Sequence, residues 1–250
     1  MRLIDTHCHL ADKDFPLNPA DCLTEAKLNG VEKIILASSD ADESHRSLAF
    51  AEQNDGVWAS VGVHPHHAKD GVEFLSQIDF KHSKLVAIGE IGLDYHYDFS
   101  PRDVQQAALR HQIEVALGQD LPIIFHVREA FTDFWQIVGD YDIKRAVVHS
   151  FSDNAINLAK VLDKGWLVGL NGIVTFTKDS EQLAVYESVP LNRLILETDA
   201  PYLAPPPVRG KINQPAYVKY VAEFLAQQRQ IAIEDLAEQT SRNAELLFSI

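Results

Sequence analysis

Six side chains that could bind a metal ion fall at the ends of five predicted strands. They are four imidazoles and two carboxylates: His7, His9, Glu90, His126, His149 and Asp199. In a barrel of parallel strands the carboxyl ends of all strands open on one face, so residues far apart in the sequence can meet there. Imidazoles together with carboxylates suit a divalent cation. These residues therefore predict metal-assisted hydrolysis.

His7 and His9 are the most compact part of this set. A spacing of two residues places both imidazoles on one face of a strand, because successive strand side chains point to opposite faces. Cys8 should face the other way, and thiolate sites usually supply several sulfurs, so we do not expect it to be a ligand. Two incidental histidines at a strand end are the alternative.

Glu90 follows an apolar run, which would carry its carboxylate into the barrel mouth. Burying an isolated carboxylate costs on the order of 20 kcal/mol in an idealised low-dielectric medium, so Glu90 needs a cation or several donors nearby. A metal would meet this need, and an ion pair with Arg128 is the alternative. His126 and His149 each close an apolar strand. One such histidine could bond to a backbone carbonyl, but two at matching strand ends favour ligands.

Two carboxylates stand at the end of the eighth predicted strand. Asp199 is assigned to the metal, and Glu197 lies two residues earlier on the same face. Because metal-bound imidazoles usually donate their second N–H to a carboxylate or carbonyl, Glu197 is expected to orient a ligand histidine. A helix-capping role is the alternative for Asp199. Six ligands with one shared carboxylate predict two divalent metal ions per chain, since a single zinc needs only three or four.

The elements that must position these residues alternate along the chain. Eight short apolar or β-branched runs are predicted strands: 3–6, 33–36, 58–63, 85–88, 122–126, 146–149, 167–170 and 194–198. Apolar residues at three- and four-residue spacing predict helices that include 104–117, 155–163, 217–228 and 234–248. This pattern predicts a single-domain (β/α)8 TIM-type barrel over residues 1–250, with the site at the C-terminal mouth. An open doubly wound sheet is the alternative, but no GxGxxG or P-loop motif supports it.

Composition limits the possible partners and compartment. With 22 basic and 36 acidic residues the net charge is −14, which argues against loose binding of long nucleic acid over the whole surface. Metal ions in a cleft could still attract phosphate locally. The amino terminus lacks the features of a secretory signal, no apolar run approaches the ~18 residues of a membrane span, and two cysteines suit a reducing compartment. We expect a cytoplasmic protein with no membrane association and no obligate protein partner.

The motifs around these residues resemble those of the TatD-type metal-dependent deoxyribonucleases, which are amidohydrolase-like barrels. The matching segments are DTHCHL at 5–10, GVHPHH at 62–67, GEIGLDY at 89–95, LPIIFHVREA at 121–130, VVHSFS at 147–152 and ETDAPYL at 197–203. They occur in the family's order and cover nearly the whole chain. The resemblance implies two metal positions that share Glu90, one held by His7, His9 and Asp199 and the other by His126 and His149.

The resemblance also implies residues that contact the substrate. His64, Arg128 and Arg209 are expected to bind it, and Arg209 and Asn213 lie in the loop after the eighth strand. The chain departs from the family pattern at the sixth strand, where Ser150 stands in place of a cysteine. A lysine would be needed at the fourth strand for a carbamylated bridging group, so Glu90 argues against a phosphotriesterase-like or dihydroorotase-like assignment.

The expected reaction is hydrolysis of DNA phosphodiesters, acting from an end of the strand. Two ions about 3.5 to 4 Å apart would lower the pKa of a shared water for in-line attack on phosphorus. Glu90 and Asp199 are the expected catalytic carboxylates, with Asp199 accepting the proton of the water. Arg128 would meet charge on the phosphoryl oxygens. Zn, Mn, Mg, Fe and Ni all remain compatible with the ligands.

Two other functions stay open on the sequence. A metal-dependent ester or amide hydrolase, for example an aminoacyl-RNA deacylase, could use the same ligands. A non-catalytic binding protein on the same barrel should have lost ligands, and none of the six is missing. If the substrate is single-stranded, Tyr95 and Tyr202 could offer rings on which bases stack, although such tyrosines more often simply pack.

Overall fold

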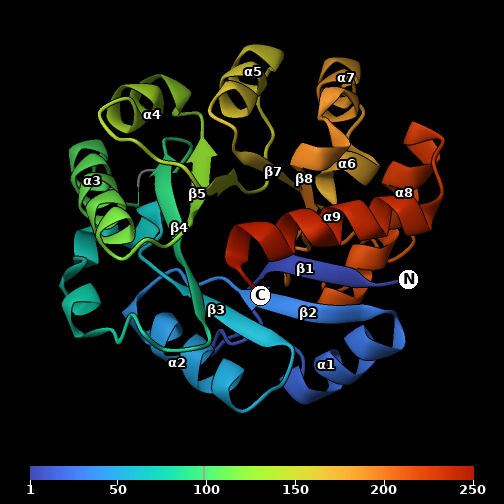
Figure 1. Cartoon of the computed structure of the whole chain (residues 1–250), viewed down its shortest axis with the longest axis horizontal. Helices are drawn as coiled ribbons and strands as arrows, with labels where there is room; N and C mark the ends of the chain where they lie inside the picture. Colours follow the sequence, from blue (N-terminus) through green and yellow to red (C-terminus); the bar gives the residue numbers. More distant parts are fainter. Residues whose placement is uncertain (98) are drawn as a thin grey trace.

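Eight parallel strands follow one another around a barrel in the computed structural model, which describes residues 1–97 and 99–250 (Figure 1). The strands are β1 Leu3–Cys8, β2 Val31–Leu36, β3 Val57–Val61, β4 Leu85–Asp94, β5 Ile123–Arg128, β6 Ala146–Val148, β7 Leu167–Leu170 and β8 Leu194–Leu196. Their spatial order is their order in the sequence. This confirms the predicted (β/α)8 barrel and excludes the doubly wound sheet, in which the strand order would reverse partway.

The helices lie outside the strands, and their ends follow local sequence signals. They are α1 Pro19–Leu28, α2 Ala41–Glu52, α3 Arg102–Gly118, α4 Phe131–Val138, α5 Ala155–Asp163, α6 Ile173–Phe176, α7 Ser180–Ser188, α8 Val218–Arg229 and α9 Ile233–Phe248, with short 3-10 turns η1 Pro65–Asp70, η2 Glu73–Gln77, η3 Leu191–Arg193 and η4 Pro215–Tyr217. Asn18, Asp40, Asn154 and Asp179 accept backbone N–H groups at the starts of α1, α2, α5 and α7. Such caps satisfy donors that a helix leaves free.

The seam between β8 and β1 closes the barrel. Cys8 and Ala200 form a parallel bridge, and the Asp199 N–H donates to the His7 carbonyl over 2.9 Å. The buried Asp5 carboxylate accepts from the Thr198 backbone N–H at 2.8 Å and from its hydroxyl at 2.6 Å. Burial raises the pKa of Asp5 to about 8, although the Thr198 bonds oppose this shift. The seam brings the end of β1 beside the loop after β8.

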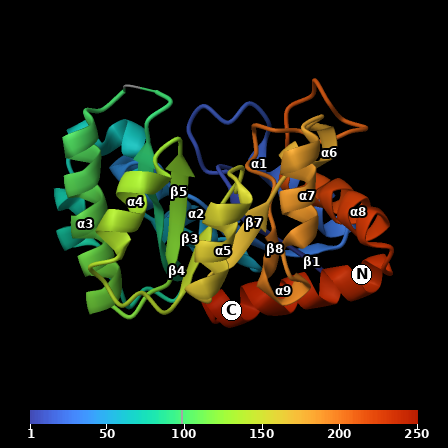
Figure 2. The ribbon, with the colours of Figure 1, turned by 90° about the horizontal axis from the view of Figure 1, so that it is seen from above.

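Helix α9 covers the end of the barrel where the strands begin, as Figure 2 shows. Asn243 donates to the Leu194 carbonyl at the start of β8, and Ser241 donates to the Arg2 carbonyl just before β1. A separate core cluster joins Ala244, Leu247 and Phe248 of α9 to residues of most strands: Ile4, Ile35, Val86, Ala87, Ile124, Val147, Leu167 and Ile195. Side chains therefore fill the barrel, and its opposite, C-terminal end is left to carry a site.

Strand β4 is longer than predicted and contains a bulge. It runs to Asp94, whereas the predicted strand ended at residue 88. Ile88 pairs with Ile123 and Ile91 with Phe125, so three steps along β4 match two steps along β5. The bulge therefore includes Gly89 and Glu90, which lie between these two pairs. Bulges commonly redirect a side chain beside an active site. A Cβ at Gly89 would lie 2.6 Å from the Cβ of Ile124, so β4 approaches β5 closely here.

No helix in the described part of the chain is long and apolar enough to cross a membrane. Cytoplasmic localisation stays a prediction.

Candidate metal centre

The six predicted ligand residues converge at the C-terminal mouth of the barrel. They come from five strands or the residues just after them: His7 from the end of β1 and His9 just after it, Glu90 from within β4 at the bulge, His126 from within β5, His149 just after β6 and Asp199 after β8. His7, His9, Glu90 and His149 are buried, while His126 and Asp199 are partly exposed. Solvent therefore reaches the side chains of His126 and Asp199, while the other four lie deeper in the mouth.

The first group surrounds a point between β1, β4 and β8. His7 Nε2 lies 3.6 Å from Glu90 Oε2 and 3.8 Å from Asp199 Oδ1. His9 Nε2 lies 3.5 Å from Glu90 Oε1 and 3.7 Å from the same Asp199 oxygen. Hydrogen bonds are shorter, about 2.7 to 3.2 Å. The separations of 3.5 to 3.8 Å in this group are instead those of two ligand atoms that each lie about 2.0 to 2.2 Å from one cation.

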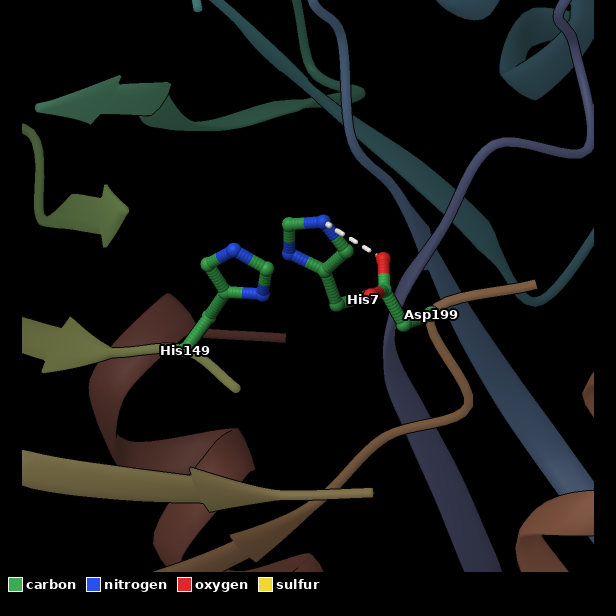
Figure 3. A group of neighbouring side chains, drawn as sticks. All are labelled: His7, His149 and Asp199. Atoms are coloured by element: carbon green, nitrogen blue, oxygen red, sulfur yellow. Dashed lines mark ion pairs between the residues drawn. The ribbon is translucent and has the colours of Figure 1, made fainter. Parts of the chain in front are cut away.

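The His7 ring is fully buried within this first group. Within the described residues neither of its ring nitrogens finds a partner. Its ring stacks on that of His149, with centroids 3.9 Å apart and planes within 6°. Figure 3 shows His7 between His149 and Asp199. Because buried polar atoms are normally satisfied, these nitrogens fit a bound cation as the missing partner.

The second group lies on the other side of Glu90. His149 Nε2 is 3.0 Å from Glu90 Oε2, His126 Nδ1 is 3.6 Å from the same oxygen, and the two nitrogens are 3.2 Å apart. Burial would raise the pKa of Glu90, but the neighbouring imidazoles, with hydrogen bonds from His126 and His149, hold it well below 4.5. Glu90 therefore contacts imidazoles of both groups as a carboxylate. The alternative ion pair between Glu90 and Arg128 does not form among the described residues.

Glu197 lies behind His149, on the side away from Glu90. Its Oε1 is 3.6 Å from His149 Nδ1 and accepts the Ser150 N–H at 2.6 Å. A Cβ at Gly169 would lie 2.3 Å from Glu197 Oε2, so glycine leaves the space that this carboxylate needs. Ser150, which departs from the expected cysteine, also accepts a hydrogen bond from Asn171 at 2.8 Å.

Of the three residues expected near the substrate, His64 lies against the centre. Its ring centroid is 4.3 Å from that of His126, and its Nδ1 accepts the His66 N–H at 3.1 Å. Burial first, and then the charge of His126, hold the pKa of His64 well below 6.5. The neutral ring therefore carries its proton on Nε2.

The two arginines contact aromatic rings. The guanidinium carbon of Arg128, at the end of β5, lies 5.1 Å from the Tyr97 ring centroid. That of Arg209 lies 3.8 Å from the Phe176 centroid, and this side chain donates to the Ala204 carbonyl at 3.0 Å. Asn213 is buried and donates to the carbonyls of Thr198 and Tyr202, so it holds the loop after β8 together.

Comparison with known proteins identifies the family. A family model described as TatD related DNase matches residues 4–249. The chain belongs to this family. A relative in Bacillus subtilis strain 168, named uncharacterized metal-dependent hydrolase YabD, is 36% identical and covers 99% of both chains. The 3'-5' ssDNA/RNA exonuclease TatD of Pectobacterium atrosepticum is 30% identical over 99% of this chain and 100% of its own.

A solved structure shows the same fold for a family member. The TatD homologue YjjV of Escherichia coli K12 superposes with a TM-score of 0.92 at 31% identity, covering 100% of this chain and 98% of its own. The chain is therefore a TatD-family metal-dependent hydrolase.

Two carboxylates of this TatD-family site were not predicted. Glu43 Oε1 lies 3.1 Å from His9 Nδ1, and Asp94 Oδ2 lies 3.0 Å from His126 Nε2. Burial would lower the pKa of His9, but the charge and hydrogen bond of Glu43, with Glu90, raise it to about 10. Asp94 lies four residues after Glu90 and so on the same face of β4. The sequence analysis missed this relationship because the predicted strand ended at residue 88. Glu43 stands three residues after the N-cap Asp40, where a glutamate looks like ordinary helix capping.

The two tyrosines suggested for base stacking differ in the structure. The Tyr95 hydroxyl is 2.8 Å from Asp133 and accepts from Gln106, while Arg102 lies over its ring at 4.3 Å. These contacts show Tyr95 packed within the fold, the alternative that the sequence favoured, and base stacking on Tyr95 stays untested. Tyr202 is 63% exposed and lies edge-on to His9.

Proposed function

We propose that this chain is a single-domain nuclease that uses two divalent cations to hydrolyse phosphodiesters of single-stranded DNA from an end. The observation that carries the proposal is the sharing of Glu90 between two ligand groups whose other atoms lie 3.0 to 3.8 Å from its oxygens or from Asp199. A relative named as a 3'-5' ssDNA/RNA exonuclease supports the substrate class.

The residues divide between two cations. His7, His9 and Asp199 would hold one cation and His126 and His149 the other, and Glu90 would contribute to both. Glu197 orients His149, in the way that carboxylates behind metal-bound imidazoles usually do. The mixed nitrogen and oxygen ligands suit Zn, Mn, Fe or Ni, and Mg can exchange into such a site.

The chain's own residues supply proton transfer and positioning. When bound, the two cations lower the pKa of water and neutralise charge that develops on phosphate. Asp199 accepts the proton of the attacking water, because its side chain is 16% exposed whereas that of Glu90 is 6% exposed. The Nε2–H of neutral His64 donates to a phosphate or leaving oxygen. Arg128, and Arg209 further along the mouth, orient the phosphate through their N–H groups.

A substrate panel tests this proposal. The purified protein is incubated with a 3'-labelled single-stranded DNA oligonucleotide, the same strand as RNA, a duplex and a set of carboxylic esters and aminoacyl-RNA, each with Mg, Mn or Zn. We expect metal-dependent shortening of the single strand and slower loss from the duplex. Hydrolysis of the carboxylic esters or aminoacyl-RNA alone would instead establish the acyl hydrolase. Binding without cleavage of any substrate would establish the non-catalytic alternative.

A further inference from the structure

An exposed pair of stacked aromatic rings lies in the loop between β4 and α3. Tyr97 is 40% exposed and Phe99 is 55% exposed. Their ring centroids are 5.2 Å apart and their planes differ by 8°, so the rings stack with an offset. Rings held parallel in solvent leave flat apolar surface uncovered, and an exposed apolar patch beside a site commonly binds a ligand.

One histidine separates this pair from the metal centre. The His66 ring meets Phe99 edge-on at 4.8 Å and Tyr97 edge-on at 5.5 Å. Its Nε2 contacts Asp94 Oδ2 at 3.0 Å, and the same oxygen contacts His126. Hydrogen bonds from His66 and His126 hold the loop rings in a set position relative to the proposed ligands. A flat group stacked on the pair would therefore keep its neighbouring atoms near the cations.

Arg128 adds a positive group to the same surface. Its guanidinium carbon lies 5.1 Å from the Tyr97 centroid, and its side chain is exposed at the end of β5. An arginine that stacks on an aromatic ring still presents N–H donors at its edge, and these suit phosphate. The loop thus offers a surface for a flat ring and a donor for an anion side by side.

From this arrangement we infer that Tyr97 and Phe99 form a base-stacking platform for one unpaired nucleobase, and that Arg128 binds the adjoining phosphate. The inference rests on the proposed function and adds that the protein recognises an unpaired base of the substrate. Stacking of a base on an aromatic side chain contributes about 1 to 3 kcal/mol and tolerates any base sequence. A chain with a net charge of −14 gains little from phosphate attraction over its surface, so stacking supplies affinity that charge does not. Paired bases are already stacked in a duplex, so the platform selects frayed or single strands.

The test compares binding of two strands that differ only in their bases. One is a fluorescent, phosphorothioate-linked oligothymidylate that resists hydrolysis, and the other is the same backbone with abasic residues. Both are titrated with metal-loaded protein and followed by fluorescence anisotropy. The variants are Phe99→Leu, which keeps apolar volume but removes the flat ring, and Phe99→Trp, which keeps it. Leu246→Ala is the matched control, because Leu246 is 69% exposed on α9 at the opposite end of the barrel.

We expect the wild-type protein to prefer the base-bearing strand, and Phe99→Leu to lower that preference about 10-fold, since ~1.4 kcal/mol corresponds to a factor of ten. Phe99→Trp should retain the preference, and Leu246→Ala should not change it. Thermal unfolding checks that each variant is folded. Equal affinity of the wild type for both strands, or an unchanged preference in Phe99→Leu, would overturn the platform. Cleavage of normal oligonucleotides separates the two ideas: a base preference without cleavage refutes the nuclease proposal alone, and cleavage without a base preference refutes the platform alone.

Discussion

Asp94 Oδ2 lies 3.0 Å from His126 Nε2, on the side of that imidazole opposite to Glu90. Burial alone would lower the pKa of His126, but the hydrogen bonds to Asp94 and Glu90 raise it. Asp94 is itself buried, and its other oxygen accepts the backbone N–H groups of His96 and Tyr97. The carboxylate therefore fixes the His126 ring with Nδ1 toward Glu90, the orientation that a ligand needs.

Asp94→Asn should weaken metal binding about 10- to 100-fold, as loss of a carboxylate behind a ligand histidine typically does. The amide has one acceptor oxygen, so it cannot accept from the two imidazoles and also from the backbone N–H groups of His96 and Tyr97, as the two carboxylate oxygens do. Metal content by elemental analysis and hydrolysis rate against metal concentration measure the effect. Asp103→Asn, at an exposed position on α3, is the control. If Asp94→Asn binds metal and turns over like the wild type, Asp94 has no positioning role.

Asp199→Asn should lower turnover about 10²- to 10⁴-fold, the range for loss of a general base, while keeping part of the metal. The amide oxygen remains near His7 and His9 but cannot take a proton. Single-turnover hydrolysis of a labelled oligonucleotide, with metal content measured on the same sample, separates the two effects. Full activity in this variant would remove Asp199 from proton transfer.

Removal of metal should abolish hydrolysis and lower the melting temperature. A cation that binds only the folded state at 100 times its Kd adds about 2.7 kcal/mol to the free energy of unfolding. In its absence the buried His7 nitrogens have no partner within the described chain. Thermal unfolding with a chelator, and then with added Zn or Mn, measures the shift. Glu90→Gln should show a much smaller response, and a chelated sample that cleaves at its original rate would contradict the metal mechanism.

Glu245 should make a small contribution to stability that depends on pH. Its Oε1 lies 2.7 Å from Lys33 Nζ and its Oε2 lies 3.0 Å from Arg2 Nη2, which ties α9 to the strand starts. The hydrogen bond from Lys33, together with both positive charges, lowers the pKa of Glu245 below 4.5. Glu245→Gln should therefore reduce the free energy of unfolding by about 0.5 to 1 kcal/mol at neutral pH.

The pH dependence follows from the sign of this shift. Because the folded-state pKa lies below the unfolded value, the contribution is complete above that unfolded value and is lost as the pH falls through the folded one. Urea unfolding at neutral and acidic pH should show the difference between wild type and Glu245→Gln shrinking on acidification. Glu238→Gln, at an exposed position on the same helix, is the control. A difference that grows at acidic pH would be inconsistent with the ion pair.

Local sequence patterns determined the barrel and the six residues at its mouth. Alternation of short apolar runs with amphipathic helices predicts eight parallel strands. The amphipathic pattern of residues 155–163 predicts helix α5 with the ends that the structure shows. Since parallel strands open at one end, a polar residue that closes an apolar run is placed at the mouth without knowledge of any contact. His7, His9, His126 and His149 all carry this signal.

Tertiary structure alone decided which side chains contact these six residues and which lie next to the site. The β4 bulge carries the strand on to Asp94, and its register depends on the fit of β4 against β5 rather than on residues 89–94 themselves. Glu43 reaches His9 only because α2 packs beside the mouth, and Tyr97 and Phe99 stack only in the folded loop. Periodicity sets which face of an element is buried. The partners that meet across elements depend on register and packing between distant segments, which no local pattern contains.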